Sequence, residues 1–165
     1  MNSFPLLPLV ELLRAELAGY GGLLALFDEQ QNQLWRREAQ AVAETSQAIE
    51  QLAAETARNR ETREAWVARF ALANGQPADA SLRRLLDFFP ADHRPLLGAL
   101  IDEINHLLHR VRRRARQNHS ILSRAVEFHR EALATLHPAA RPRTYAPSGR
   151  MGNLAGPAAA LQATG

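Results

Sequence analysis

The feature that most constrains this chain is a run of twelve positions that step alternately by four and three residues. Ten of these positions are apolar, and the two exceptions are Asn118 and His129. This spacing places one stripe along an α-helix and predicts that the helix packs lengthwise against another helix. A helix over residues 97–136 would be about 60 Å long, whereas a compact globule of this chain length is roughly 40 Å across. We therefore expect an elongated bundle. The twelve positions are Leu97, Ile101, Ile104, Leu108, Val111, Ala115, Asn118, Leu122, Ala125, His129, Ala132 and Leu136.

The front half of the chain shows a similar pattern. Apolar residues recur by fours and threes from Leu6 to Leu34, and a more polar amphipathic segment follows over 37–73. A turn is predicted at 74–79, and a short helix at 82–89. Ala and Leu are abundant, with 30 and 25 copies, against five Val and four Ile, which disfavours a β-rich fold. The sequence predicts an all-α, antiparallel helical bundle or coiled coil.

Three glycines interrupt the first of these helices. Gly19, Gly21 and Gly22 each cost roughly 1 kcal/mol of helix stability relative to Ala. We expect either a kink at this point or a close contact with a neighbouring helix.

The chain divides into a helical domain over residues 1–137 and a tail over 138–165. The tail holds four Pro, four Gly and eight Ala, with three Arg and no acidic residue. Such a composition buries too little apolar surface to offset its ordering entropy, so we expect the tail to be disordered. No long uncharged apolar run or secretory leader is evident, and we expect no membrane insertion.

The charged residues are distributed unevenly. All 20 basic residues are Arg, and five of them fall within residues 110–116. The first 80 residues are acidic overall, so we interpret the run as a solvated face that pairs with Asp and Glu of neighbouring helices. Binding to an acidic protein partner has the same physical basis. Nucleic-acid binding is not expected, because the run has no interleaved aromatic residues and no DNA-reading motif.

The sequence offers little that resembles a catalytic centre. Glu103 and His106 form a single Glu-x-x-His pair, whereas a four-helix di-iron site needs two such pairs and two further Glu. The helical histidines lack a companion pattern that would mark a phosphotransfer residue. Strand-turn-helix nucleophile signals, Gly-rich phosphate loops and cysteines are also missing from the sequence. We therefore expect no enzyme activity, no metal and no cofactor.

The polar residues Asn118 and His129 allow two readings of the long C-terminal helix. They can fix the register of an internal bundle, as a buried Asn does in coiled coils. Alternatively, the protein's own helices do not cover this stretch, and it receives an amphipathic helix from a partner. A self-paired dimer would satisfy the same spacing. On the second reading the binding face comprises Asn118, Leu122, Ala125, Val126, His129, Leu133 and Leu136.

Two short motifs point to a family. Gln117-Asn118-His119-Ser120-Ile121-Leu122 lies in the last helix, and Thr144-Tyr145-Ala146-Pro147-Ser148-Gly149 lies after it. Together with the order of the helices over residues 6–150, they resemble the FlgN family of flagellar type III export chaperones. Thr144, Tyr145 and Gly149 match a Thr-Tyr-x-x-x-Gly motif of that family.

The resemblance implies a cytoplasmic protein without catalytic activity. It implies binding of the C-terminal helical segments of hook-filament junction proteins and their delivery to the type III export gate. It also implies that Tyr145 contacts the gate protein FlhA. Two alternatives stay open at this point. They are a scaffolding coiled-coil protein without an export client and, less favoured, an Arg-mediated nucleic-acid binder.

Overall fold

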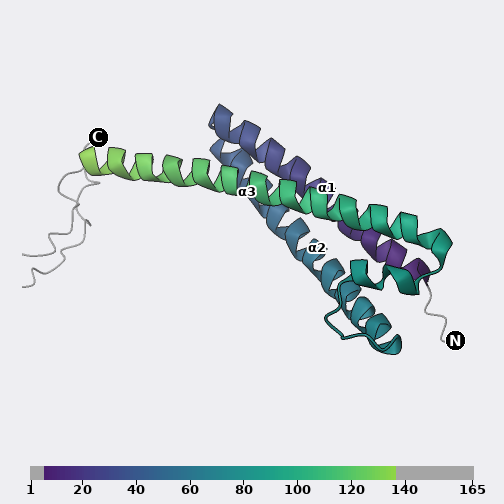
Figure 1. Cartoon of the computed structure of the whole chain (residues 1–165). Helices are drawn as coiled ribbons and strands as arrows, with labels where there is room; N and C mark the ends of the chain where they lie inside the picture. Colours follow the sequence, from purple (N-terminus) through teal and green to yellow (C-terminus); the bar gives the residue numbers. More distant parts are fainter. Residues whose placement is uncertain (1–5, 137–165) are drawn as a thin grey trace, which may run out of the picture. The chain divides into compact units, whose positions relative to one another are not determined.

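The structure is a computed structural model, and it describes residues 6–136. Its three long helices are α1 (Leu6–Arg36), α2 (Ala39–Ala73) and α3 (Arg94–Leu136). Between α2 and α3 lie two 3₁₀ helices, η1 (Leu82–Phe88) and η2 (Ala91–His93) (Figure 1). Within this range every regular element is helical, which confirms the all-α prediction. The chain divides into two units, residues 1–125 and residues 126–165, and the packing below concerns the first.

Contacts between the helices define an up-down-up order in the first unit. Gln30 of α1 bonds to Ser46 of α2, and Glu16 of α1 pairs with Arg63 near the other end of α2, so these two helices are antiparallel. Asp28 of α1 pairs with Arg114, near the middle of α3. The core includes Leu9 of α1 and Leu97 of α3, each near the start of its helix, and Figure 1 shows the two helices running in the same direction.

The glycines of α1 allow α2 to come close. Gly19 is buried, and a Cβ built on it would lie 2.4 Å from the hydroxyl oxygen of Thr56. A Cβ on Gly22 would lie 2.9 Å from a terminal methyl of Leu52, whereas one on Gly21 would meet no atom within 4 Å. Of the two expectations for this region, the structure therefore supports the close contact between helices.

The connection between α1 and α2 is a two-residue link built around Arg37. Arg37 has φ of 58°, in the left-handed region that favours glycine. The N–H of Glu38 donates to the carbonyl of Gln33, and the N–H of Arg37 donates to that of Leu34. This is the Schellman pattern of a helix C-terminus. An L-residue at the left-handed position costs about 1 kcal/mol or more.

One end of the bundle is closed by aromatic rings. Trp66 and Phe70 of α2 stack with centroids 5.3 Å apart, and Phe70 stacks on Phe89 at 4.3 Å. Phe89 follows η1, whose Leu82 and Leu85 are buried in the same core. The short segment predicted at 82–89 thus covers this end of the three long helices.

The buried face of α1 differs from the predicted stripe. Several stripe positions are only half-buried, including Leu17, Leu24 and Phe27. The reason is that α1 packs against both α2 and α3, so its buried sector is wider than a two-helix seam. The sector also includes polar side chains that a count of apolar residues omits. The buried residues of α1 are Leu9, Val10, Leu13, Glu16, Gly19, Tyr20, Leu23, Gln30 and Gln33.

Glu16 is the most deeply buried charge among the described residues. Its side chain is 1% exposed, and Nε of Arg63 lies 2.6 Å from its Oε2. The Tyr20 hydroxyl lies 3.5 Å from the other carboxylate oxygen. The pKa of the Tyr20 hydroxyl is raised, mainly because the group is buried and to a smaller extent because of the negative charge of Glu16.

Candidate binding face on the last helix

Burial along α3 follows the heptad and then stops. The buried residues of this helix are Leu97, Ile104, Val111 and Asn118, which are spaced by seven. The position seven residues after Asn118 is Ala125, which is exposed, although the apolar spacing of the sequence continues. After Asn118 no described residue of α3 is buried, although Leu122, the next stripe position, is still half-buried.

A hydrogen-bonded polar layer lies at Asn118, the last buried position of α3 among the described residues. The Asn118 amide donates to the Phe27 carbonyl at 2.7 Å and to Oε1 of Gln30 at 2.9 Å. Gln30 in turn donates to the Ser46 hydroxyl at 2.9 Å. The layer of Asn118, Gln30 and Ser46 thus joins all three long helices. Directional bonds of this kind specify register, as the internal reading of Asn118 predicted.

The remaining predicted face residues lie beyond this layer. Leu122 is half-buried, and Ala125 is exposed. In the second unit, Val126, His129, Leu133 and Leu136 are all exposed, and Leu136 retains 73% of its accessible surface. Asn118 thus differs from the other predicted residues, because its side chain lies inside the bundle.

Phe128 was absent from the predicted face, yet it is 68% exposed. Its ring meets His129 edge-on, with centroids 6.1 Å apart. It lies one residue before a stripe position, which is why counting by fours and threes passes over it. The signal that would have found it is its heptad spacing from Ile121, because the two form a second apolar column beside the stripe.

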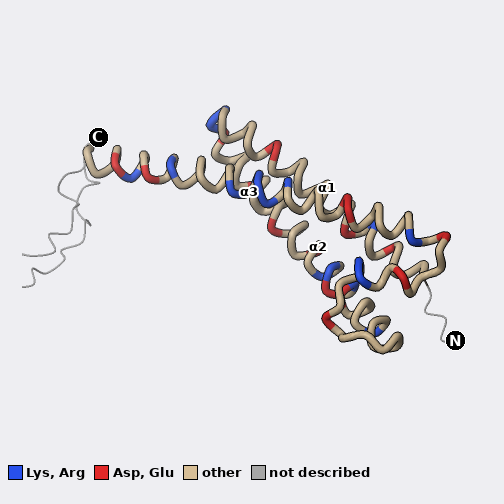
Figure 2. Tube along the Cα trace, viewed as in Figure 1, with Lys and Arg blue, Asp and Glu red and all other residues tan. Residues whose placement is uncertain are grey.

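Only one arginine of the run at 110–116 forms the expected ion pair with a neighbouring helix among the described residues. Arg114 pairs with Asp28 of α1, its Nε 2.6 Å from Oδ1. Within residues 6–136, Arg110, Arg112, Arg113 and Arg116 form no ion pair. Figure 2 shows the run as a block of basic residues midway along α3. Most of the charge of this run is therefore not neutralised by neighbouring helices.

Candidate metal ligands are not gathered in the described part of the chain. Glu103 and His106 are both exposed on α3. Among residues 6–136, no three side chains of the His, Asp and Glu types come together as a metal site would require.

Comparison with known families decides the identity of the chain. The family model described as FlgN protein matches residues 8–153, which is most of the sequence. The chain belongs to the FlgN family. FlgN proteins are flagellar export chaperones and not an enzyme family, so the resemblance in the sequence is confirmed. The matched range includes Thr144, Tyr145 and Gly149, which lie outside the residues that the structure describes.

Two further comparisons were made for this FlgN-family chain, one with curated proteins and one with solved structures. No significant match to a curated protein or to a solved structure was found. From residue 6 to residue 136, none of the helices combines the length and the apolar character that crossing a bilayer requires.

Proposed function

We propose that this FlgN-family chain binds the C-terminal helical segments of hook-filament junction proteins through α3 and delivers them to the type III export gate. The observation that carries the proposal is the exposed apolar spacing after Asn118. Val126, Leu133 and Leu136 keep 55%, 60% and 73% of their surface. An amphipathic helix from a client would bury these side chains by the same packing that α3 uses earlier in the bundle.

The binding face comprises Leu122, Ala125, Val126, His129, Leu133 and Leu136, with Asn118 at the point where a client would begin to replace the protein's own helices. The exposed ring of Phe128 extends this face on one side. Covering the client's apolar face in the cytoplasm keeps it from self-association before export. A stable complex of this kind buries about 1,200–2,000 Å² in total.

Calorimetric titration tests the client assignment. The full chain is titrated with C-terminal peptides of the cognate hook-filament junction proteins, and an unrelated amphipathic helix serves as the control. Selective one-to-one binding supports the proposal. Equal binding of the control peptide, or no binding, would favour the scaffolding alternative.

A pair of matched variants tests the location of the face. Leu122→Asp with Leu133→Asp places two carboxylates on it, and we expect client affinity to fall at least tenfold. Ser123→Asp with Ala134→Asp adds the same charge one residue later, turned by about 100° around the helix, at positions that are exposed. Equal affinities of the two variants, with helicity retained in both, would show that the face is wrongly placed.

Delivery to the gate is proposed to depend on Tyr145, with Thr144 and Gly149 in the same tail motif. An aromatic side chain in a short segment can anchor a chain in a groove of its partner. Tyr145→Ala should abolish binding to the cytoplasmic domain of FlhA while client affinity stays within twofold. Unchanged FlhA binding in a pull-down would remove Tyr145 from the proposal.

A further inference from the structure

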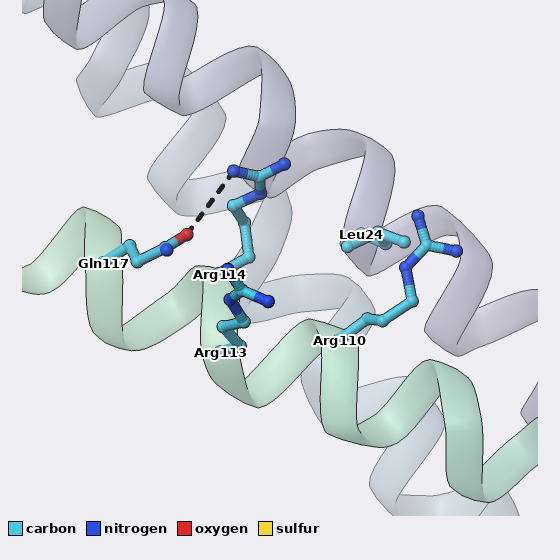
Figure 3. A pocket seen from close by; sticks show the side chains of 5 residues that line it. All are labelled: Leu24, Arg110, Arg113, Arg114 and Gln117. Carbon is cyan, nitrogen blue, oxygen red and sulfur yellow. Dashed lines mark hydrogen bonds between the residues drawn. The ribbon is translucent and has the colours of Figure 1, made fainter.

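A small cavity in the first unit is lined mostly by arginines. Leu24 of α1 forms one wall, and Arg110, Arg113, Arg114 and Gln117 of α3 form the rest. The cavity has a volume of about 200 Å³. Figure 3 shows Arg110 reaching toward the turn of α1 that carries Leu24, and Arg114 bonded to Gln117.

The arginines of this cavity are not equivalent. Arg114 is held by the Asp28 carboxylate, and its Nη1 donates to Oε1 of Gln31 at 2.9 Å. Arg110 and Arg113 have no ion-pair partner among residues 6–136. Asp28 balances one of the three positive charges, so the cavity keeps two unneutralised guanidinium groups.

The chemistry of the lining favours a carboxylate on an apolar stem. A guanidinium group binds carboxylate or phosphate oxygens through two parallel hydrogen bonds. Leu24 offers an apolar wall that can pack against the methylene groups of an Asp or Glu side chain. An inorganic anion has no apolar group to make this contact. Exposed ion pairs are individually weak, so the anion must belong to a larger ligand that makes other contacts.

We propose that Arg110, Arg113 and Gln117 form a docking site for an acidic side chain of a bound polypeptide. The identification of that polypeptide as the export client rests on the proposed function. Gln117 precedes Leu122 by five residues, about 7.5 Å along the helix. Gln117 also lies about 140° around the helix from Leu122, so the acidic side chain must come from a part of the client outside the helix that covers Leu122.

The test reads the site directly by NMR, without assuming the client. Side-chain Nε–Hε signals of Arg110 and Arg113 are followed in the full chain while hexaglutamate, hexaglutamine or sodium phosphate is added. We expect hexaglutamate to shift these two signals and hexaglutamine to leave them unchanged. No shift with hexaglutamate overturns the site. Phosphate acting at lower concentration than hexaglutamate overturns the assignment to a peptide.

Matched variants then connect the site to the client. Arg110→Gln with Arg113→Gln should weaken binding of the hook-filament junction peptide about five- to tenfold, as expected for two exposed ion pairs. Arg112→Gln with Arg116→Gln removes the same charge from exposed positions that do not line the cavity, and should change affinity by less than twofold. Equal losses in both variants would reduce the effect to net charge and overturn the proposal. If the wild-type chain binds no such peptide while hexaglutamate still shifts the two arginine signals, the proposed function fails and the acidic docking site stands.

Discussion

The different surroundings of Gly19, Gly21 and Gly22 predict different effects on stability for the three Gly-to-Ala substitutions in α1. Ala is a better helix former than Gly by about 1 kcal/mol, so each substitution stabilises the protein where space permits. Gly21→Ala meets nothing within 4 Å and should gain this amount in full. Gly22→Ala meets only the flexible end of Leu52 at 2.9 Å, and its net effect should be near zero.

Gly19→Ala faces a different neighbour. The new Cβ would lie 2.4 Å from the Thr56 hydroxyl oxygen and 3.0 Å from its methyl carbon. Thr56 is 2% exposed and its hydroxyl donates to the Leu52 carbonyl at 2.8 Å, so it has little freedom to move away. Overpacking of this kind costs about 1–3 kcal/mol. After the gain in helix propensity, Gly19→Ala should lower the free energy of unfolding by up to about 2 kcal/mol.

Urea unfolding followed by far-ultraviolet circular dichroism measures these differences. The stabilities of Gly21→Ala and Gly19→Ala should differ by about 1–3 kcal/mol. Gly19→Ala combined with Thr56→Ala removes the clash, so the two substitutions should show a favourable coupling energy. Equal stabilities of the Gly19 and Gly21 variants would refute the argument that Gly19 is required for the approach of α2.

Further predictions concern the polar groups of the bundle. Arg63→Met leaves the buried Glu16 carboxylate without its partner and should cost about 3 kcal/mol in urea unfolding, whereas Glu16→Leu with Arg63→Met should be near neutral. The raised pKa of Tyr20 means that the folded state favours the neutral phenol. The stability that this preference contributes is present below the ordinary pKa of about 10 and is lost as pH rises above it. The free energy of unfolding of Tyr20→Phe should therefore fall less steeply at alkaline pH than that of the wild-type chain. Asn118→Ala should lower stability by about 1–3 kcal/mol, because buried partners lose their donor. Arg37→Gly should raise the free energy of unfolding by about 1 kcal/mol. If the measured change in the free energy of unfolding had the opposite sign for any of these variants, the corresponding argument would be contradicted.

Sequence spacing was sufficient for the helices and for their ends to within a few residues. The run from Leu97 predicted α3, and the turn at 74–79 separates α2 from η1 as expected. Spacing could not reveal that α1 has two neighbours, because heptad counting assumes a single facing helix. It also could not place Glu16, whose burial depends on Arg63, 47 residues away along the chain.

The candidate site was only partly accessible from sequence. The stripe after Asn118 was identified, but the spacing is the same whether a helix is covered by its own chain or left exposed. Only the three-dimensional packing distinguishes Val111, which is buried, from Leu133, which is not. The arginine cavity depends on Leu24 of α1 lying beside α3, and no local pattern encodes that proximity.

The two ends of the three-helix unit differ in the kind of side chains that pack near them, and this has a consequence for how the unit opens. Trp66, Phe70 and Phe89 form stacked rings near one end, whereas the packing toward the α1–α2 turn includes hydrogen-bonded polar side chains, among them Asn118 and Gln30. Local unfolding starts where few apolar contacts must be broken. Amide hydrogen exchange should therefore be fastest at the α1–α2 turn and slowest near Phe70. Fraying of α1 and α2 would then begin at the turn that joins them.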